Sequence, residues 1–134
     1  MIPFEFTIKG PPVSAQTKNR SRLQQWKNEV KVEAQRALGS ASSISNDDIC
    51  ATITYYYEGD TPDVDNIVKP ILDGLVGVCY VDDNQVVESK SRKRSINGSY
   101  KIRRASSVLL TAFSAGDEFL HIRLTKAEKS EDLD

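Results

Sequence analysis

Apolar and polar residues alternate in three stretches of the chain, and each stretch predicts a strand. The clearest is Ile49–Glu58, in which β-branched and aromatic side chains occupy the two faces in turn. Phe4–Ile8 shows the same alternation and stops at Gly10-Pro11-Pro12. Glu118–Lys126 alternates near the end of the chain. The pattern therefore predicts a sheet built from the start, the middle and the end of the sequence.

Two other stretches carry the three- and four-residue spacing of a helix. The first runs from Arg22 to Gly39, a glycine placed where helices often end. We interpret its basic side chains as a solvent-exposed face: Lys27, Lys31 and Arg36. The second is short, is capped by Asp65 and ends at Gly77, and Pro70 predicts an irregular first turn. Its apolar face has four-residue steps: Ile67, Ile71 and Leu75.

The segments after the short helix predict a turn and a basic hairpin. Val78–Val81 fits a short buried strand or a bend, and Asp82-Asp83-Asn84 fits a turn. Residues 85–94 predict a strand, and Asn97-Gly98 predicts a hairpin turn with a return strand over residues 101–104. Residues 105–113 fit either a helix or a strand. The fold class is α/β (α+β), with a mixed sheet and packed helices in one domain over residues 1–128, and residues 129–134 are expected to be a disordered acidic tail.

The composition is that of an ordinary globular protein. The chain has 134 residues, of which 39% are hydrophobic and 28% charged. There is no apolar run long enough to cross a membrane, and the N-terminus lacks the features of a signal peptide. Cys50 and Cys79 fit no metal-ligand spacing, so we expect buried reduced thiols in a cytoplasmic protein.

Charges are segregated along the chain although the net charge is only −1. Residues 1–46 hold seven bases and three acids, whereas residues 47–88 hold ten acids and one base. Residues 89–116 hold seven bases and no acid, and the segment from Asp117 onward is acidic again. An acidic centre between two basic blocks suits a metal-dependent enzyme that acts on a polyanion. Runs of surface charge without such a role would give the same pattern.

The acidic centre contains two groups of aspartates, one on either side of the predicted short helix. Asp63 and Asp65 precede the helix, and Asp82 and Asp83 follow it. If this segment folds back on itself, the carboxylates gather, and Mg²⁺ binds carboxylate oxygens together with waters and substrate phosphates. Each aspartate taken singly also has a purely structural explanation, since aspartates cap helices and fill turns.

The full pattern of this segment is more specific than its single aspartates. Lys69 and Asp73 follow Asp65 at four-residue steps, which places the three residues on one helical face. The string PDVDNIVKPILDGL, followed after five residues by VDDNQVV, closely resembles the signature of the RusA-like Holliday junction resolvases. These are crossover junction endodeoxyribonucleases of bacteria and their phages. The resemblance is specific over residues 62–88, looser at the N-terminus, and absent after Arg94.

The resemblance implies a small homodimeric enzyme that makes paired nicks in branched DNA, a four-way junction. It implies Mg²⁺ as the cofactor, with Mn²⁺ able to substitute, and no organic cofactor. The metal-binding catalytic aspartates correspond to Asp63, Asp65 and Asp83. Lys69 corresponds to the motif's lysine, and it would stabilise the transition state by its charge or orient the attacking water. Residues that would support this site from its surroundings are Asp73, Asp82 and Gln85, the last by orienting a metal ligand.

Basic residues outside the acidic centre are expected to contact DNA phosphates, which gives salt-dependent binding with little sequence information. Three precede the first predicted helix, whose N-terminal end attracts anions: Lys18, Arg20 and Arg22. Seven lie on the predicted basic hairpin: Lys90, Arg92, Lys93, Arg94, Lys101, Arg103 and Arg104. Family members that grip junctions tend to be basic, whereas this chain is slightly acidic.

The sequence leaves two other functions open. The chain would be a non-catalytic module that binds branched DNA if its metal site were degenerate, although the intact aspartates and lysine argue against this. A Ca²⁺-stabilised structural domain is a weaker alternative, because no EF-hand spacing is present. His121, the only histidine, lies in the middle of the last predicted strand, and we do not expect it to act as a catalytic base.

Overall fold

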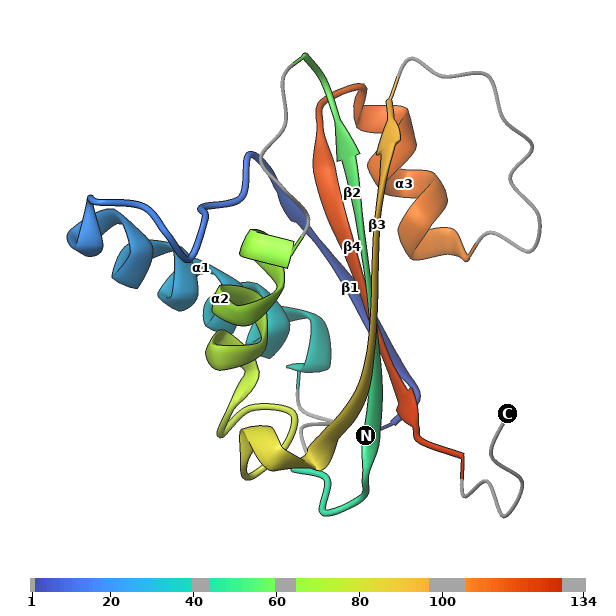
Figure 1. The fold of residues 1–134 in the computed structure, drawn as a ribbon. Helices are drawn as coiled ribbons and strands as arrows, with labels where there is room; N and C mark the ends of the chain where they lie inside the picture. The colour runs from blue at the N-terminus through green and yellow to red at the C-terminus, as the bar shows by residue number, and fades with distance from the viewer. Residues whose placement is uncertain (1, 40–43, 60–64, 97–105, 129–134) are drawn as a thin grey trace, which may run out of the picture.

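The computed structural model of the chain describes residues 2–39, 44–59, 65–96 and 106–128. Four strands form one sheet: β1 (Phe4–Lys9), β2 (Ile49–Tyr57), β3 (Val86–Ser95) and β4 (Phe119–Lys126). The other described elements are the helices α1 (Arg20–Leu38), α2 (Asp65–Leu75) and α3 (Ser107–Ala115) and the 3₁₀ helix η2 (Asp83–Gln85). Together they form a single small α+β domain with a mixed sheet, as the residue pattern predicts (Figure 1).

The strand order in the sheet is β1-β4-β2-β3. β4 pairs antiparallel with β1 and with β2, so the last strand of the chain lies between strands from its start and its middle. β2 and β3 pair in parallel. Parallel neighbours need a crossover connection, and the connection between these two strands contains α2 and η2. The predicted catalytic segment is therefore this crossover.

α1 and α2 pack together on one face of the sheet (Figure 1). Trp26 and Val30 of α1 are buried against Ile67 and Ile71 of α2, and all four belong to one hydrophobic core with the inward residues of β2 and β4. Each fully buried aliphatic side chain contributes about 1.5–3 kcal/mol through its removal from water. This packing fixes the position of α2 and, with it, the position of the catalytic segment.

α2 continues through Pro70, which lies in its second turn. Proline lacks an N–H group, so the carbonyl four residues earlier, that of Asn66, receives no helical hydrogen bond from it. The backbone N–H of Ala15, in the loop before α1, donates to this carbonyl at 2.7 Å. A tertiary hydrogen bond therefore replaces the helical one.

The opposite face of the sheet is covered at one end by α3 (Figure 1). Three rings form a cluster: the centroid of Tyr56 of β2 lies 4.7 Å from that of Phe113 of α3 and 4.8 Å from that of Phe119 of β4, and the two phenylalanines are 5.2 Å apart. The aromatic contacts anchor α3 to the sheet. Much of this face is left open, and it forms the hollow described below.

The structure corrects the predicted start of the first helix. α1 begins at Arg20 because Asn19 caps it, its side chain accepting a hydrogen bond from the N–H of Arg22 at 3.0 Å. Arg20 and Arg22 therefore lie inside the first turn and do not precede the helix. Over Val78–Val81, where the sequence fits a short strand or a bend, the structure has the bend, with isolated bridges in place of a strand.

The structure also resolves the open choice over residues 105–113 in favour of a helix. α3 begins at Ser107, and the hydroxyl of Ser106 caps it by accepting from the N–H of Leu109 at 3.2 Å. The predicted hairpin turn at Asn97-Gly98, its return strand and the acidic tail over residues 129–134 lie outside the described residues.

Both cysteines are buried free thiols, as predicted. Burial raises the pKa of the Cys79 thiol to about 11, so this cysteine is protonated and unreactive at neutral pH. Over the described ranges, the structure contains no helix with the length and apolar character that crossing a bilayer requires.

Candidate active site

Lys69 links the two parts of the predicted catalytic segment. Its Nζ atom lies 2.9 Å from Oδ1 of Asp73, one turn further along α2, and 3.2 Å from Oδ2 of Asp83 on η2. The fold therefore brings together residues that are 14 positions apart in the sequence. Lys69 and Asp83 are both more than half exposed, so a substrate can reach them.

The contacts fix the charge states of the pair. Hydrogen bonds to Asp73 and then to Asp83 raise the pKa of Lys69 above its ordinary value. Contact with the Asp82 side chain and then with Lys69 lowers the pKa of Asp83 below its ordinary value. At neutral pH the site thus holds an ammonium group beside an ionised carboxylate.

Lys27 of α1 connects this site to the first helix. Its Nζ atom lies 3.2 Å from Oδ2 of Asp73, so that Asp73 is held between Lys27 on one oxygen and Lys69 on the other. Lys27 and Asp73 are both about three-quarters buried. The interpretation of Lys27 as part of a solvent-exposed face is therefore wrong, because the partner helix covers it.

The turn that carries Asp83 is held by a capping box. The side chain of Asp82 accepts from the N–H of Asn84 at 3.1 Å, and Oε1 of Gln85 accepts from the N–H groups of Val81 and Asp82 at 2.8 and 2.9 Å. Nε2 of Gln85 donates to the carbonyls of residues 45 and 47 at 2.9 Å each. Gln85 thus ties the turn to the segment before β2 and fixes where Asp83 stands.

The two remaining predicted aspartates are placed only in part. Asp65 is the first residue of α2, one helical turn before Lys69. Asp63 lies outside the described residues. Within the described part of the chain, no three side chains of the carboxylate, histidine or cysteine type gather closely enough to hold a metal ion.

The chemistry of the described donors nevertheless suits a hard divalent cation. Asp83 is an ionised and exposed carboxylate, and Asp82 is its immediate neighbour. Mg²⁺ is usually held by one or two carboxylates together with waters and substrate phosphates. The Asp83 carboxylate fits that pattern.

The predicted DNA-contacting residues fall into two groups. Lys18 is exposed in the loop before α1. Arg20 donates to the carbonyl of Ala15 at 3.1 Å, and Arg22 pairs with Glu29 at 3.0 Å. The second group lies on β3: Lys90, Arg92, Lys93 and Arg94. The last three predicted contacts lie outside the described residues: Lys101, Arg103 and Arg104.

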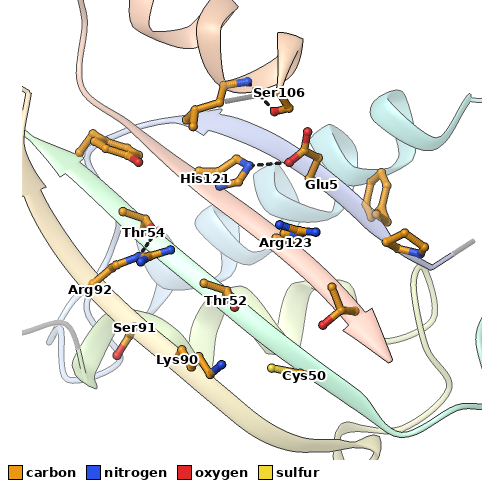
Figure 2. Close-up of a pocket in the computed structure, with 15 residues that line it drawn as sticks. Glu5, Cys50, Thr52, Thr54, Lys90, Ser91, Arg92, Ser106, His121 and Arg123 are labelled. Carbon is orange, nitrogen blue, oxygen red and sulfur yellow. Dashed lines mark hydrogen bonds and ion pairs between the residues drawn. The ribbon is translucent and has the colours of Figure 1, made fainter. Parts of the chain in front are cut away.

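The open face of the sheet forms a hollow of about 790 Å³ (Figure 2). Lys90 and Arg92 of β3 line it, and so does Arg123 of β4, which sequence reasoning did not select. His121 also lines it and lies 3.0 Å from Oε2 of Glu5. The alternation of β4 places both residues on this face, but only the pairing of β4 next to β2 shows that they share it with the cations of β3.

Burial alone would raise the pKa of Glu5. Hydrogen bonds with Ser106 and His121 and the charges of His121 and Arg123 oppose this and lower the pKa below its ordinary value. Glu5 is therefore a carboxylate at neutral pH and holds three elements together: β1, β4 and the start of α3.

An exposed carboxylate beside a lysine, on a crossover between parallel strands, defines a class of site suited to phosphate chemistry with a divalent ion. The model of the family described as endodeoxyribonuclease RusA matches residues 9–103 of the chain. The chain therefore belongs to the RusA endodeoxyribonuclease family, and it is a phosphodiester hydrolase. A search of curated proteins found no match.

Proposed function

We propose that the chain is a Mg²⁺-dependent Holliday junction resolvase that makes paired nicks in four-way DNA junctions. The observation that carries the proposal is the contact of Lys69 with Asp83, inside the segment that the RusA family model matches. Mn²⁺ is expected to substitute for Mg²⁺. We assign the nuclease domain to residues 1–128. We place the enzyme in the cytoplasm of a bacterium or of a phage-infected cell.

Asp63, Asp65 and Asp83 would hold the metal ion. When bound, the ion supplies an activated water at neutral pH and positive charge for the oxygens of the phosphodiester. Asp83 is suited to its part because it is already ionised and is held in place by the capped turn.

Lys69 acts through its charge. Its raised pKa keeps it protonated at neutral pH, so it is not available as a general base. An ammonium group beside Asp83 can meet the negative charge that develops on the phosphate in the transition state. Asp73 pairs with this ammonium at 2.9 Å and is itself held by Lys27 through its other oxygen.

A four-way junction has two-fold symmetry, so two copies of the chain would place one site on each of two equivalent strands. We therefore propose a homodimer, which a light-scattering mass measurement tests directly. The basic residues of β3 and of the loop before α1 would contact the phosphates of the junction arms.

The proposal is tested by nicking of an end-labelled four-way junction in Mg²⁺, with a linear duplex of the same sequence as a second substrate. Asp65→Asn, Asp83→Asn and Lys69→Met are each expected to reduce nicking by about 100-fold or more, since each removes a group needed in the transition state. Asp117→Asn is the matched control, because this exposed aspartate pairs only loosely with Lys9, at 3.9 Å.

A resolvase is supported if the chain nicks the junction but not the linear duplex, if the three variants lose this nicking, and if Asp117→Asn keeps it. A wild-type chain that binds the junction but never cuts it in Mg²⁺ or Mn²⁺ contradicts the catalytic proposal. The chain would then be a binding module for branched DNA.

A further inference from the structure

We propose that the hollow on the open face of the sheet binds the phosphodiester backbone of DNA, with Arg123 as a contact that lies outside the family match. The inference rests on the proposed function for its substrate. It adds a second DNA-binding surface, on the face of the sheet opposite α1 and α2.

The strand register brings three cations together around this hollow. Thr52 of β2 pairs with Lys90 on one side and with Arg123 on the other. Because adjacent strands are about 4.8 Å apart, the backbones of Lys90 and Arg123 are separated by about 10 Å across the floor. Arg92 follows Lys90 two residues along β3, about 6.6 Å further. The cations thus surround a floor of threonine hydroxyls (Figure 2).

The cations are held in positions suited to phosphate. Nε of Arg92 donates to Oγ1 of Thr54 at 2.9 Å, an interaction visible in Figure 2. This bond holds the guanidinium through Nε, and its terminal amino groups can donate to a phosphate bound in the hollow. Lys90 is exposed and lies 3.8 Å from Glu88, a distance at which the ion pair contributes little.

Among the described residues that line the hollow, Glu5 is the one carboxylate, and it does not cancel the positive charge. Its carboxylate lies against His121 and is paired within the wall of the hollow (Figure 2). Three permanent cations stand against this single anion. The volume of about 790 Å³ lies within the range of about 300–1,000 Å³ found for ligand sites. It is larger than the volume that a single small ion occupies.

The lining favours DNA over a second copy of the chain. Cores of protein interfaces are depleted in charged residues, whereas this hollow is lined by three cations and by several hydroxyl groups. Two copies related by a two-fold axis would also bring like charges together, which is unfavourable.

β3 leads from the turn that carries Asp83 to the hollow. β3 starts at Val86, directly after η2, and Lys90 follows about 13 Å further along the strand, at about 3.3 Å for each of four residues. β3 lies at the end of the strand order. DNA that leaves the Lys69–Asp83 site can therefore pass round β3 and reach the hollow.

The test measures the binding of a fluorescent four-way junction in EDTA, so that no cleavage occurs, at several salt concentrations. Arg123→Gln is expected to weaken binding about three- to tenfold at 0.1 M salt and to reduce the slope of log K against log salt by about 0.9, the value for one lost phosphate contact. Arg123→Glu is expected to weaken binding further. Arg36→Gln is the matched control, because Arg36 lies on α1 and pairs with Glu33.

Thermal melting and sedimentation of each variant accompany the binding measurement. Wild-type affinity and salt slope in both Arg123 variants would overturn the inference. Weaker binding accompanied by a change in oligomeric state would overturn it as well, because the hollow would then be an interface between copies. A wild-type chain that binds in EDTA but never nicks in Mg²⁺ contradicts the proposed function and leaves this inference intact.

Discussion

Replacement of Gly74 by alanine tests whether the contact between α1 and α2 positions the catalytic segment. Gly74 lies in α2 beside the backbone of α1. A Cβ atom at this position would lie 2.7 Å from the carbonyl oxygen of Lys27 and 3.1 Å from two side-chain atoms of Val30. Ordinary contact begins at 3.4 Å, so α2 must withdraw from α1 by about 0.7 Å, the difference between 3.4 and 2.7 Å.

Two opposing effects decide the change in stability. Alanine in place of glycine within a helix is favourable by about 1 kcal/mol. Overpacking costs about 1–3 kcal/mol, and the upper end applies here because the nearest atom belongs to the backbone and cannot rotate away. The net loss is about 2 kcal/mol, which for 134 residues lowers the Tm by about 7 °C.

The same displacement would stretch the ion pair between Lys27 and Asp73 from 3.2 Å towards 3.9 Å and loosen Lys69. Gly74→Ala should therefore reduce the rate of junction nicking at saturating DNA, with the Kd for the junction unchanged. Thermal melting and single-turnover nicking are the two assays. Ala37→Gly measures the alanine–glycine difference at an exposed position of α1.

A gain of about 1 kcal/mol in Gly74→Ala, equal and opposite to the loss in Ala37→Gly, would refute the reasoning. It would mean that helix propensity alone acts at this position and that α1 does not restrain α2. The melting result stands whether or not the chain is a nuclease.

Two further predictions concern the side chains that hold the site and the hollow. Lys27→Met should lower the rate of nicking about fivefold, equivalent to about 1 kcal/mol, but should have no further effect in a Lys69→Met background. If the effect of Lys27→Met adds in full to that of Lys69→Met, Lys27 does not act through Lys69. Lys31→Met is the control. Glu5→Gln should destabilise the fold by about 1–2 kcal/mol at pH 7, because it removes charged hydrogen bonds from a side chain that is 25% exposed. Since the pKa of Glu5 is lowered on folding, the stability that its carboxylate contributes is complete above the unfolded pKa of 4.5 and is lost as the pH falls through the folded pKa. The free energies of unfolding of wild type and variant, measured in urea, should therefore converge in acid. A constant difference between them across this pH range would contradict the stabilising role of the Glu5 carboxylate.

The sequence predicts the strands well where alternation is clear. Ile49–Glu58 and Glu118–Lys126 became β2 and β4 with nearly the predicted bounds, because each buries one or both of its faces. The apolar face of α2 was predicted from its spacing, and Ile67, Ile71 and Leu75 are all fully buried. The spacing of apolar residues predicts which side chains are buried, and β2, β4 and α2 each pack on the core through such a set of buried side chains.

Contacts between elements could not be predicted in the same way. Lys27 and Asp73 are 46 positions apart, and only the packing of α1 on α2 brings them together. Arg123 joins the cations of β3 because β4 pairs with β2, an order that no local pattern in the sequence specifies. The start of α1 was misplaced for a local reason, since the capping role of Asn19 was overlooked.

The hydrogen bond from Ala15 to the carbonyl of Asn66 has a consequence for how the protein folds. A helix with alanine at position 70 would close its own first turns and could form early, independent of its surroundings. Pro70 prevents this, so the first turns of α2 are complete only when the loop before α1 has docked. The loop and the catalytic helix should therefore order in one cooperative step, and native-state hydrogen exchange should show the amide of Ala15 opening together with those of α2.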